Sequence, residues 1–214
     1  MFLGGYAFLI DAILTFAQSR VRPDDLAFAS LLADVLVERF EDRAHGGFFF
    51  TGEDHERLIM RPKTLADDAT PSGNGVAAFA LGRLGHLLGE TRYLDAAERA
   101  LKGGWDAVLQ APSAHCTMLL ALEEYLFPTQ TVVIRGEQEA LARWQQRATA
   151  PYAPRRLTVA IPGQAQSLPA LLTERRALGT TTAYVCSGHS CDAPVTDFGE
   201  LNRVLAKSEV RREA

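Results

Sequence analysis

The sequence predicts a mainly α-helical chain that ends in a smaller α/β segment, and three observations indicate this. In residues 1–128, apolar residues recur at spacings of three and four in five stretches, the pattern of helices with one buried face. After residue 129, two runs rich in β-branched residues flank a helical stretch, as in a β-α-β unit. The period changes at Pro128, so we expect a helical part over residues 1–128 and an α/β part over residues 129–214.

The composition is that of a globular chain of 214 residues with an ordinary core. Hydrophobic residues make up 47% of the chain and the formal net charge is −4, so we expect neither disorder nor a basic face for nucleic acid. No uncharged apolar run reaches about 18 residues, which argues against a membrane span. Three cysteines, an odd number, argue against a disulfide framework and favour a reducing compartment, so we expect a cytoplasmic protein.

The N-terminal stretch predicts a core helix that ends before a turn at Pro23. Asp11 interrupts its apolar run and no basic region precedes it, so we do not expect a signal peptide. Its apolar residues are Tyr6, Leu9, Ile10, Ile13, Leu14 and Phe16. A second helix is expected from Asp24 onward. Its apolar residues are Phe28, Leu31, Leu32, Val35, Leu36 and Phe40.

Two glycines, Gly46 and Gly47, end this helical pattern. The aromatic run at residues 48–50, the polar turn GEDHE and the apolar residues 58–60 predict a short hairpin or another ordered excursion.

A polar turn over residues 61–74, RPKTLADDATPSGN, leads into the third helix. Thr70 is the expected N-cap, Pro71 the expected first helical residue and Gly89 the expected end of the helix. A helix N-terminus offers free N–H donors and a positive dipole end, which suit hydroxyl-rich or anionic ligands, so we place the candidate site here. The apolar stripe of the helix is Val76, Ala77, Ala80, Leu81, Leu84, Leu87 and Leu88.

Two further helices are expected before the change of period. The apolar residues of the fourth are Tyr93, Leu94, Ala97, Leu101, Trp105 and Val108. The fifth follows Pro112 and carries Met118, Leu119, Leu122, Tyr125 and Leu126. In the α/β part, strands over residues 131–136 and 155–161 should be parallel with a right-handed helical crossover. A third strand over residues 180–186 precedes the turn CSGHSC, and a final helix covers residues 198–205.

Two motifs carry a family resemblance, DATPSGN after the glycine-aromatic stretch and TAYVCSGHSCDAPVTD near the C-terminus. Together with GGYAFLIDAIL, GGFFFT and TVVIRG, they resemble the spermatogenesis-associated, thioredoxin-domain-containing protein family. The resemblance implies a thioredoxin-like domain, then an (α/α) toroid similar to six-hairpin glycosidases and sugar epimerases, then a small α/β segment. This chain matches only the later hairpins and the tail, so we expect a partial toroid from a truncated product or fragment. Its exposed toroid edge should favour self-association.

The resemblance also implies a carbohydrate-directed activity, epimerase-like or glycosidase-like, in which carboxylates act as acid and base. Asp67 aligns with the acidic position of the family motif and is the candidate catalytic residue. The alternative is that it binds backbone N–H groups of the turn. Neighbouring side chains of an extended segment point in opposite directions, so Asp67 and Asp68 are not expected to face one substrate. Acidic residues often stand in the family where this chain has Gly4 and Gly5, which weakens the case for an intact enzyme.

The candidate substrate-binding residues are Tyr6, Arg61, Lys63, Asp68, Ser72 and Asn74. For Ser72 and Asn74 the alternative is helix capping, and for Arg61 and Lys63 it is a solvated strand.

The turn CSGHSC brings two thiols and one imidazole within six residues. Structural zinc sites usually have four ligands, so Cys186, His189 and Cys191 are weak candidates for a metal site. Reduced thiols in a tight turn are the favoured interpretation, with a reversible disulfide as the alternative. No C-x-x-C motif occurs, and we expect no cofactor.

Two classes of function therefore remain. One is a carbohydrate-directed toroid, whose polar residues should converge on one pocket, and the other is a non-catalytic helical interaction scaffold. The helices do not recur at the period of tetratricopeptide repeats, so a scaffold would derive from a toroid rather than from a repeat array.

Overall fold

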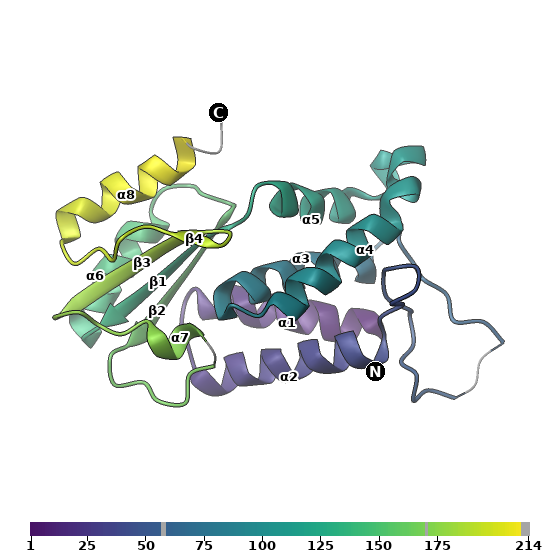
Figure 1. Ribbon diagram of the computed structural model, residues 1–214, viewed down its shortest axis with the longest axis horizontal. Coiled ribbons are helices and arrows are strands. Elements are labelled where there is room, and N and C mark those ends of the chain that lie inside the picture. The colour runs from purple at the N-terminus through teal and green to yellow at the C-terminus, as the bar shows by residue number, and fades with distance from the viewer. Residues whose placement is uncertain (57–58, 170, 211–214) are drawn as a thin grey trace.

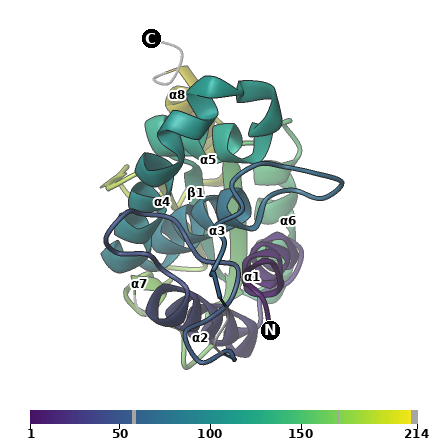
Figure 2. The same cartoon turned by 90° about the vertical axis from the view of Figure 1, so that its right-hand side faces the viewer.

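A computed structural model describes residues 1–56, 59–169 and 171–210. Five long helices form the first part: α1 (Leu3–Ala17), α2 (Pro23–Arg39), α3 (Gly73–Leu88), α4 (Thr91–Gln110) and α5 (Cys116–Leu126), with a 3₁₀ turn over Pro112–Ala114 before α5. Helix α3 lies at the centre and packs against α1, α4 and α5 (Figure 1). The long connection from α2 to α3 crosses one end of these helices (Figure 2). None of the described helices combines the length and apolarity that a membrane crossing requires.

The second part is a small mixed sheet. Its strands are β1 (Gln130–Gly136), β2 (Arg156–Pro162), β3 (Thr181–Ser187) and β4 (Ser190–Cys191), in the order β2-β1-β3-β4. Strands β1 and β2 are parallel, as the β-α-β pattern predicts, whereas β3 is antiparallel to both β1 and β4. Helices α6 (Gln138–Thr149) and α8 (Phe198–Val210) accompany the sheet, and the short α7 (Leu171–Glu174) contacts α3.

The sheet separates two apolar cores, because successive side chains of a strand point to opposite faces. Val132 and Ile134 of β1 pack with α6 and α8, including Trp144. Val133 and Val159 instead belong to the core that contains α1 to α5. The helical part and the sheet therefore share one core, although the change to α/β structure falls at β1. The partial (α/α) toroid that the family resemblance implies for residues 1–128 remains a prediction.

The buried face of each of several helices contains fewer residues than the apolar pattern of the sequence predicts. The buried residues of α1 are Leu3, Ala7, Ile10, Leu14 and Ala17, which lie along one line of the helix. Phe16 lies off this line and is 72% exposed, so its assignment to the core was wrong. The same correction applies to further predicted stripe residues on α2, α4 and α5, which are also exposed: Phe28, Leu31, Trp105, Tyr125 and Leu126.

Helix α3 begins two residues later than predicted. Ser72, not Thr70, is the N-cap, and its Oγ accepts the Gly75 N–H at 3.0 Å. Pro71 lies before the helix because the Asp67 carboxylate binds the Ser72 N–H and holds the turn together up to that residue. The predicted end at Gly89 is confirmed, with a positive φ that suits glycine.

The predicted hairpin at residues 48–60 is an ordered excursion within the described residues. Phe48 forms a single β-bridge with Glu41, and Phe50 N–H binds the Pro62 carbonyl. Leu58 lies outside the described residues.

Candidate functional site

Asn74 binds two loops to the first turn of α3. Its Oδ1 accepts the Phe48 N–H at 2.7 Å. Its Nδ2 donates to the carbonyls of Phe48 at 2.9 Å and Thr64 at 3.0 Å. The side chain is fully buried, so these bonds are made where an unpaired polar group would be costly. Asn74 thus uses both amide hydrogens within the protein.

Asp67 joins the beginnings of α3 and α5. Its Oδ1 accepts the Ser72 N–H at 2.7 Å and its Oδ2 accepts the Thr117 N–H at 2.8 Å. Partial burial raises the pKa of Asp67, but the bonds from Thr117 and Ser72 more than offset this, so the pKa lies below its ordinary value. An ionised carboxylate in this position stabilises a turn. A catalytic role for it remains a prediction.

The other candidate residues do not converge with Asp67. Arg61 donates to the Thr51 carbonyl at 2.6 Å and lies over the Phe49 ring. Lys63 forms an ion pair with Asp42 at 2.7 Å.

Asp68 is exposed and Tyr6 packs against the ring of Phe40. The structure brings Asp67, Ser72 and Asn74 together at the start of α3, but their bonds are to the backbone.

A separate cavity of about 510 Å³ lies between α3, α4, α5 and the turn from β3 to β4, within the usual size range of small-molecule sites. Its wall is mainly apolar and includes Phe79, Leu94, Leu101 and Ala121. The polar residues that line it include His86, Asp95, Glu98, Glu124, Tyr125 and His189. Asp67, Ser72, Asn74 and Tyr6 do not line this cavity.

Two histidines meet at the cavity although they lie far apart in the sequence. The rings of His86 on α3 and His189 on the β3–β4 turn are 5.7 Å apart, edge to face. Burial and the proximity of His189 lower the pKa of His86, so this imidazole is neutral at neutral pH. No spacing in the sequence indicates this pair, because the two residues come from different elements and no motif connects them.

Two of the three carboxylates that line the cavity are neutralised by basic neighbours. Glu124 binds the Arg83 guanidinium, with Nε at 2.9 Å, and also accepts the Thr129 hydroxyl. Glu98 pairs with Lys102 at 2.6 Å, and this bond, followed by one from Tyr125, lowers the pKa of Glu98. The cavity therefore suits an apolar or uncharged ligand with a few hydrogen-bonding groups.

The turn CSGHSC contains a disulfide between Cys186 and Cys191. The favoured expectation of reduced thiols was wrong, because β3 and β4 pair so that these two cysteines are direct cross-strand partners. Cys116 is a free, exposed thiol. Among the residues that the structure describes, no three potential ligands from His, Cys, Asp and Glu gather into a metal site.

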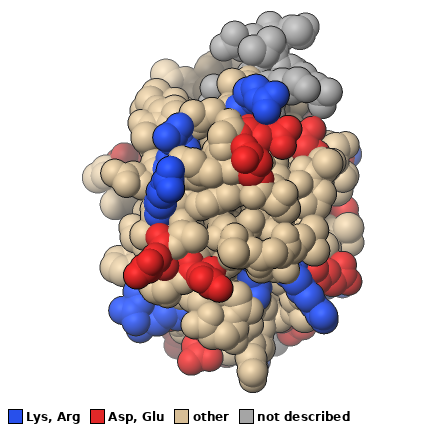
Figure 3. Space-filling model, turned by 90° about the vertical axis from the view of Figure 1, so that its left-hand side faces the viewer, with Lys and Arg blue, Asp and Glu red and all other residues tan. Residues whose placement is uncertain are grey.

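Charge is mixed on the face that carries the end of the sheet (Figure 3). Basic and acidic side chains are interspersed there, so that face offers no continuous patch of one sign.

Comparison with known proteins confirms the family resemblance. No family model matches the chain. Spermatogenesis-associated protein 20 from Homo sapiens is 30% identical over 212 residues, which are 95% of this chain and 27% of that protein. The Rattus norvegicus protein of the same name is 29% identical over 213 residues, with the same coverage. An uncharacterised Caenorhabditis elegans protein is 25% identical over 211 residues, 96% of this chain and 28% of its own length. The chain thus spans about a quarter of the length of these relatives.

Proposed function

We propose that this chain, which spans about a quarter of the length of the similar spermatogenesis-associated protein 20, is a non-catalytic helical scaffold within a protein of this kind. One observation carries the proposal. The polar residues of the family-like motif, Asp67, Ser72 and Asn74, bind backbone groups of the turns around α3. They fasten the α2–α3 connection and α5 to the central helix.

A carboxylate that acts as general acid or base changes its protonation state during the reaction, and the protonated form is a weaker acceptor for bound N–H groups. Both oxygens of Asp67 already hold backbone N–H groups, Ser72 on one side and Thr117 on the other. Engaging a substrate would weaken at least one of these bonds and leave a donor at a helix start without its partner. This geometry favours the structural role.

Exposed apolar side chains supply surfaces on which a scaffold could bind further polypeptide. Phe28 and Leu31 lie one turn apart on α2, and Leu31 is 58% exposed. Trp105 and Leu109 lie one turn apart on α4 and are also exposed. Exposed apolar side chains that gather into a contiguous patch mark interaction sites in soluble proteins. The partner we propose is polypeptide outside this chain or a second copy of it.

A thermal-shift screen with monosaccharides and sugar phosphates tests the scaffold proposal. Asp67→Asn and Asp68→Asn form a matched pair, because only Asp67 binds backbone groups through its carboxylate. We expect no saturable shift with any sugar, and a lower melting temperature for Asp67→Asn alone. A saturable shift that Asp67→Asn abolishes and Asp68→Asn preserves would support a sugar site and contradict the scaffold.

The carbohydrate-directed function is the second candidate, and the cavity between α3, α4 and α5 favours it. Aromatic rings and carboxylates line one space there, including Phe79, Tyr125 and Glu98, and the space is large enough for a small sugar. Gly82 also lines it, and a Cβ added there meets no atom within 4 Å.

Gly82→Leu should therefore fill the cavity, while Gly82→Ala leaves it open. Calorimetric titration with sugars should show binding to Gly82→Ala that Gly82→Leu has lost; equal binding to both variants rejects this site.

A further inference from the structure

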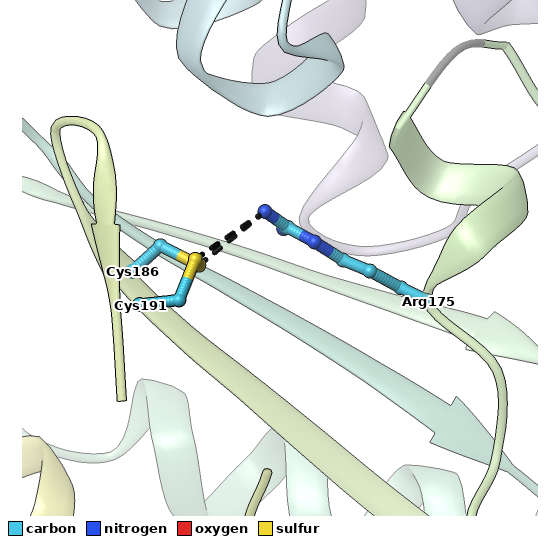
Figure 4. The surroundings of a disulfide bond; sticks show 3 residues. All are labelled: Arg175, Cys186 and Cys191. Carbon is cyan, nitrogen blue, oxygen red and sulfur yellow. Dashed lines mark hydrogen bonds between the residues drawn. A yellow bond between two sulfur atoms is a disulfide. The ribbon is translucent and has the colours of Figure 1, made fainter. Parts of the chain in front are cut away.

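A buried arginine faces the disulfide of the β3–β4 turn. Arg175 is 6% exposed, and its Nη2 donates to the Cys186 sulfur at 3.3 Å and to the Cys191 sulfur at 3.8 Å (Figure 4). Its Nη1 is buried and has no hydrogen-bond partner within the described part of the chain. Burial lowers the pKa of Arg175, and no carboxylate among the described residues pairs with it.

This arrangement is energetically unfavourable if the contact between Arg175 and the disulfide is purely structural. Burial disfavours a cation that has no counter-ion, and a disulfide sulfur is only a weak acceptor. The same cation would be well placed if negative charge formed on the sulfur. Reduction of the disulfide forms such a charge, because a cation beside a thiol favours its thiolate.

We propose that Cys186–Cys191 is a redox-active disulfide that exchanges with external dithiols, and that Arg175 is a positioning residue that stabilises the Cys186 thiolate. The two sulfurs have different surroundings. Cys186 is 4% exposed and lies nearer to Arg175, whereas Cys191 is an exposed residue. The sulfur of the exposed residue, Cys191, is thus the proposed point of attack, and the sulfur of the buried Cys186 is the leaving group.

The exchange proceeds in two balanced steps. A thiolate of the dithiol attacks the Cys191 sulfur and forms a mixed disulfide, while the Cys186–Cys191 bond breaks and its electron pair leaves on Cys186 beside Arg175. The second thiol of the dithiol gives its proton to water. The resulting thiolate attacks the first sulfur of the dithiol, which is the one bonded to Cys191 in the mixed disulfide. Cys191 then leaves as a thiolate and takes a proton from water. The protein disulfide gains two electrons, and the dithiol becomes a cyclic disulfide.

Reduction of the disulfide should also affect the cavity between α3, α4 and α5. The turn between the two cysteines carries His189, whose ring contacts His86. Opening the disulfide removes the covalent closure of that turn.

Dithiothreitol is the probe for the test, and the experiment uses the full chain with Cys116→Ser, so that only the pair reacts. Arg175→Met should slow reduction at pH 7 by about threefold to fivefold, because about one pKa unit on the leaving thiol changes the exchange rate by less than the tenfold change in its ionisation. Arg175→Lys keeps a cation and should restore most of the rate. Arg135→Met is the matched control, because Arg135 is also buried and its hydrogen-bond partners within the described residues are the backbone carbonyls of Leu172 and Gly163. Rates for Arg175→Met within about twofold of the parent, or an equal loss in Arg135→Met, overturn the proposal.

A second measurement does not depend on how well the Arg175 variants fold. With Cys116→Ser and Cys191→Ser, Cys186 is the remaining thiol and Arg175 is intact. Burial alone would keep this thiol protonated at pH 7, whereas the guanidinium should keep it ionised. Thiolate absorbance near neutral pH supports the proposal, and its appearance only well above the ordinary thiol pKa contradicts it.

Discussion

Asn74 shows how one buried amide can hold together segments that are distant in sequence. Its bonds reach Phe48 and Thr64, at separations of 26 and 10 residues. Asn74→Ala should lower the free energy of unfolding by about 2–3 kcal/mol, because buried backbone groups of both segments lose their partners. Urea unfolding measures this, with Asn202→Ala on an exposed position of α8 as the control. A loss of unfolding free energy below about 0.5 kcal/mol, the size of an ordinary surface substitution, would contradict this structural role of Asn74.

Asp42, which pairs with Lys63, makes a pH-dependent contribution to stability. A hydrogen bond from Lys63, helped by the N–H groups of His45 and Ala44, outweighs desolvation and lowers the pKa of Asp42 to about 2. A carboxylate with a lowered pKa in the folded state stabilises fully above its ordinary pKa of 3.8, and the contribution is lost as the pH falls toward about 2.

Comparing Asp42→Asn with the parent protein tests this sign. The difference in unfolding free energy should be largest at pH 5 to 7 and should shrink between pH 4 and pH 2. In a Lys63→Met background the same substitution should have a smaller effect, because the main partner is already absent. A difference that stays constant down to pH 2 would show that Asp42 is not coupled to folding in this way.

At the residue scale, the sequence predicted where polar groups gather but not what they bind. Asp67, Ser72 and Asn74 do meet at the start of α3, as the capping alternatives allow. Their partners include Phe48 and Thr117, which no local spacing connects to the motif. Hydrogen bonds between distant segments depend on tertiary packing, so a local pattern could not decide between ligand contact and structural use.

Among the elements, α3 contains glycines with opposite structural roles. A Cβ at Gly82 would meet nothing within 4 Å, whereas one at Gly75 would lie 2.8 Å from the Thr117 Cβ and 2.9 Å from the Met118 nitrogen. Gly82→Ala should raise the free energy of unfolding by about 0.5–1 kcal/mol, because alanine restricts the unfolded chain and favours helix. Gly75→Ala should lower it by about 1–3 kcal/mol, because α5 must shift.

Thermal unfolding of the two alanine variants compares these effects within one helix. The melting temperature should rise for Gly82→Ala and fall for Gly75→Ala. A destabilised Gly82→Ala variant would mean that the space beside α3 is occupied, and an unaffected Gly75→Ala variant would mean that α3 and α5 approach less closely.

The helices themselves were well predicted, because a strong period of three to four residues survives in any packing arrangement. Which apolar residues face the core was predicted less well. Phe16 and Leu31 belong to the apolar stripes by spacing, yet both are exposed because the helices of this structure cover only part of each stripe. The Cys186–Cys191 pairing depends on the register of β3 with β4, so the spacing within the turn left a disulfide only as the alternative to reduced thiols.

For the whole molecule, the core shared by the helices and the sheet determines how it unfolds. Val133 of β1 packs in the same core as α1 to α5, while Trp144 of α6 lies on the other face of the sheet. Apolar contacts that continue across residue 129 should couple the two parts, so we expect one cooperative transition.

The two tryptophans allow a direct test, because Trp105 belongs to α4 and Trp144 to α6. In Trp105→Phe, an exposed position, the fluorescence of Trp144 reports the α/β part, while far-UV circular dichroism reports mainly the five long helices. The two urea midpoints should coincide, and Val133→Ala should lower both together by removing buried methyl groups from the shared core. Two separate midpoints, or a Val133→Ala effect on fluorescence alone, would instead show that residues 1–128 and 129–214 fold as independent domains.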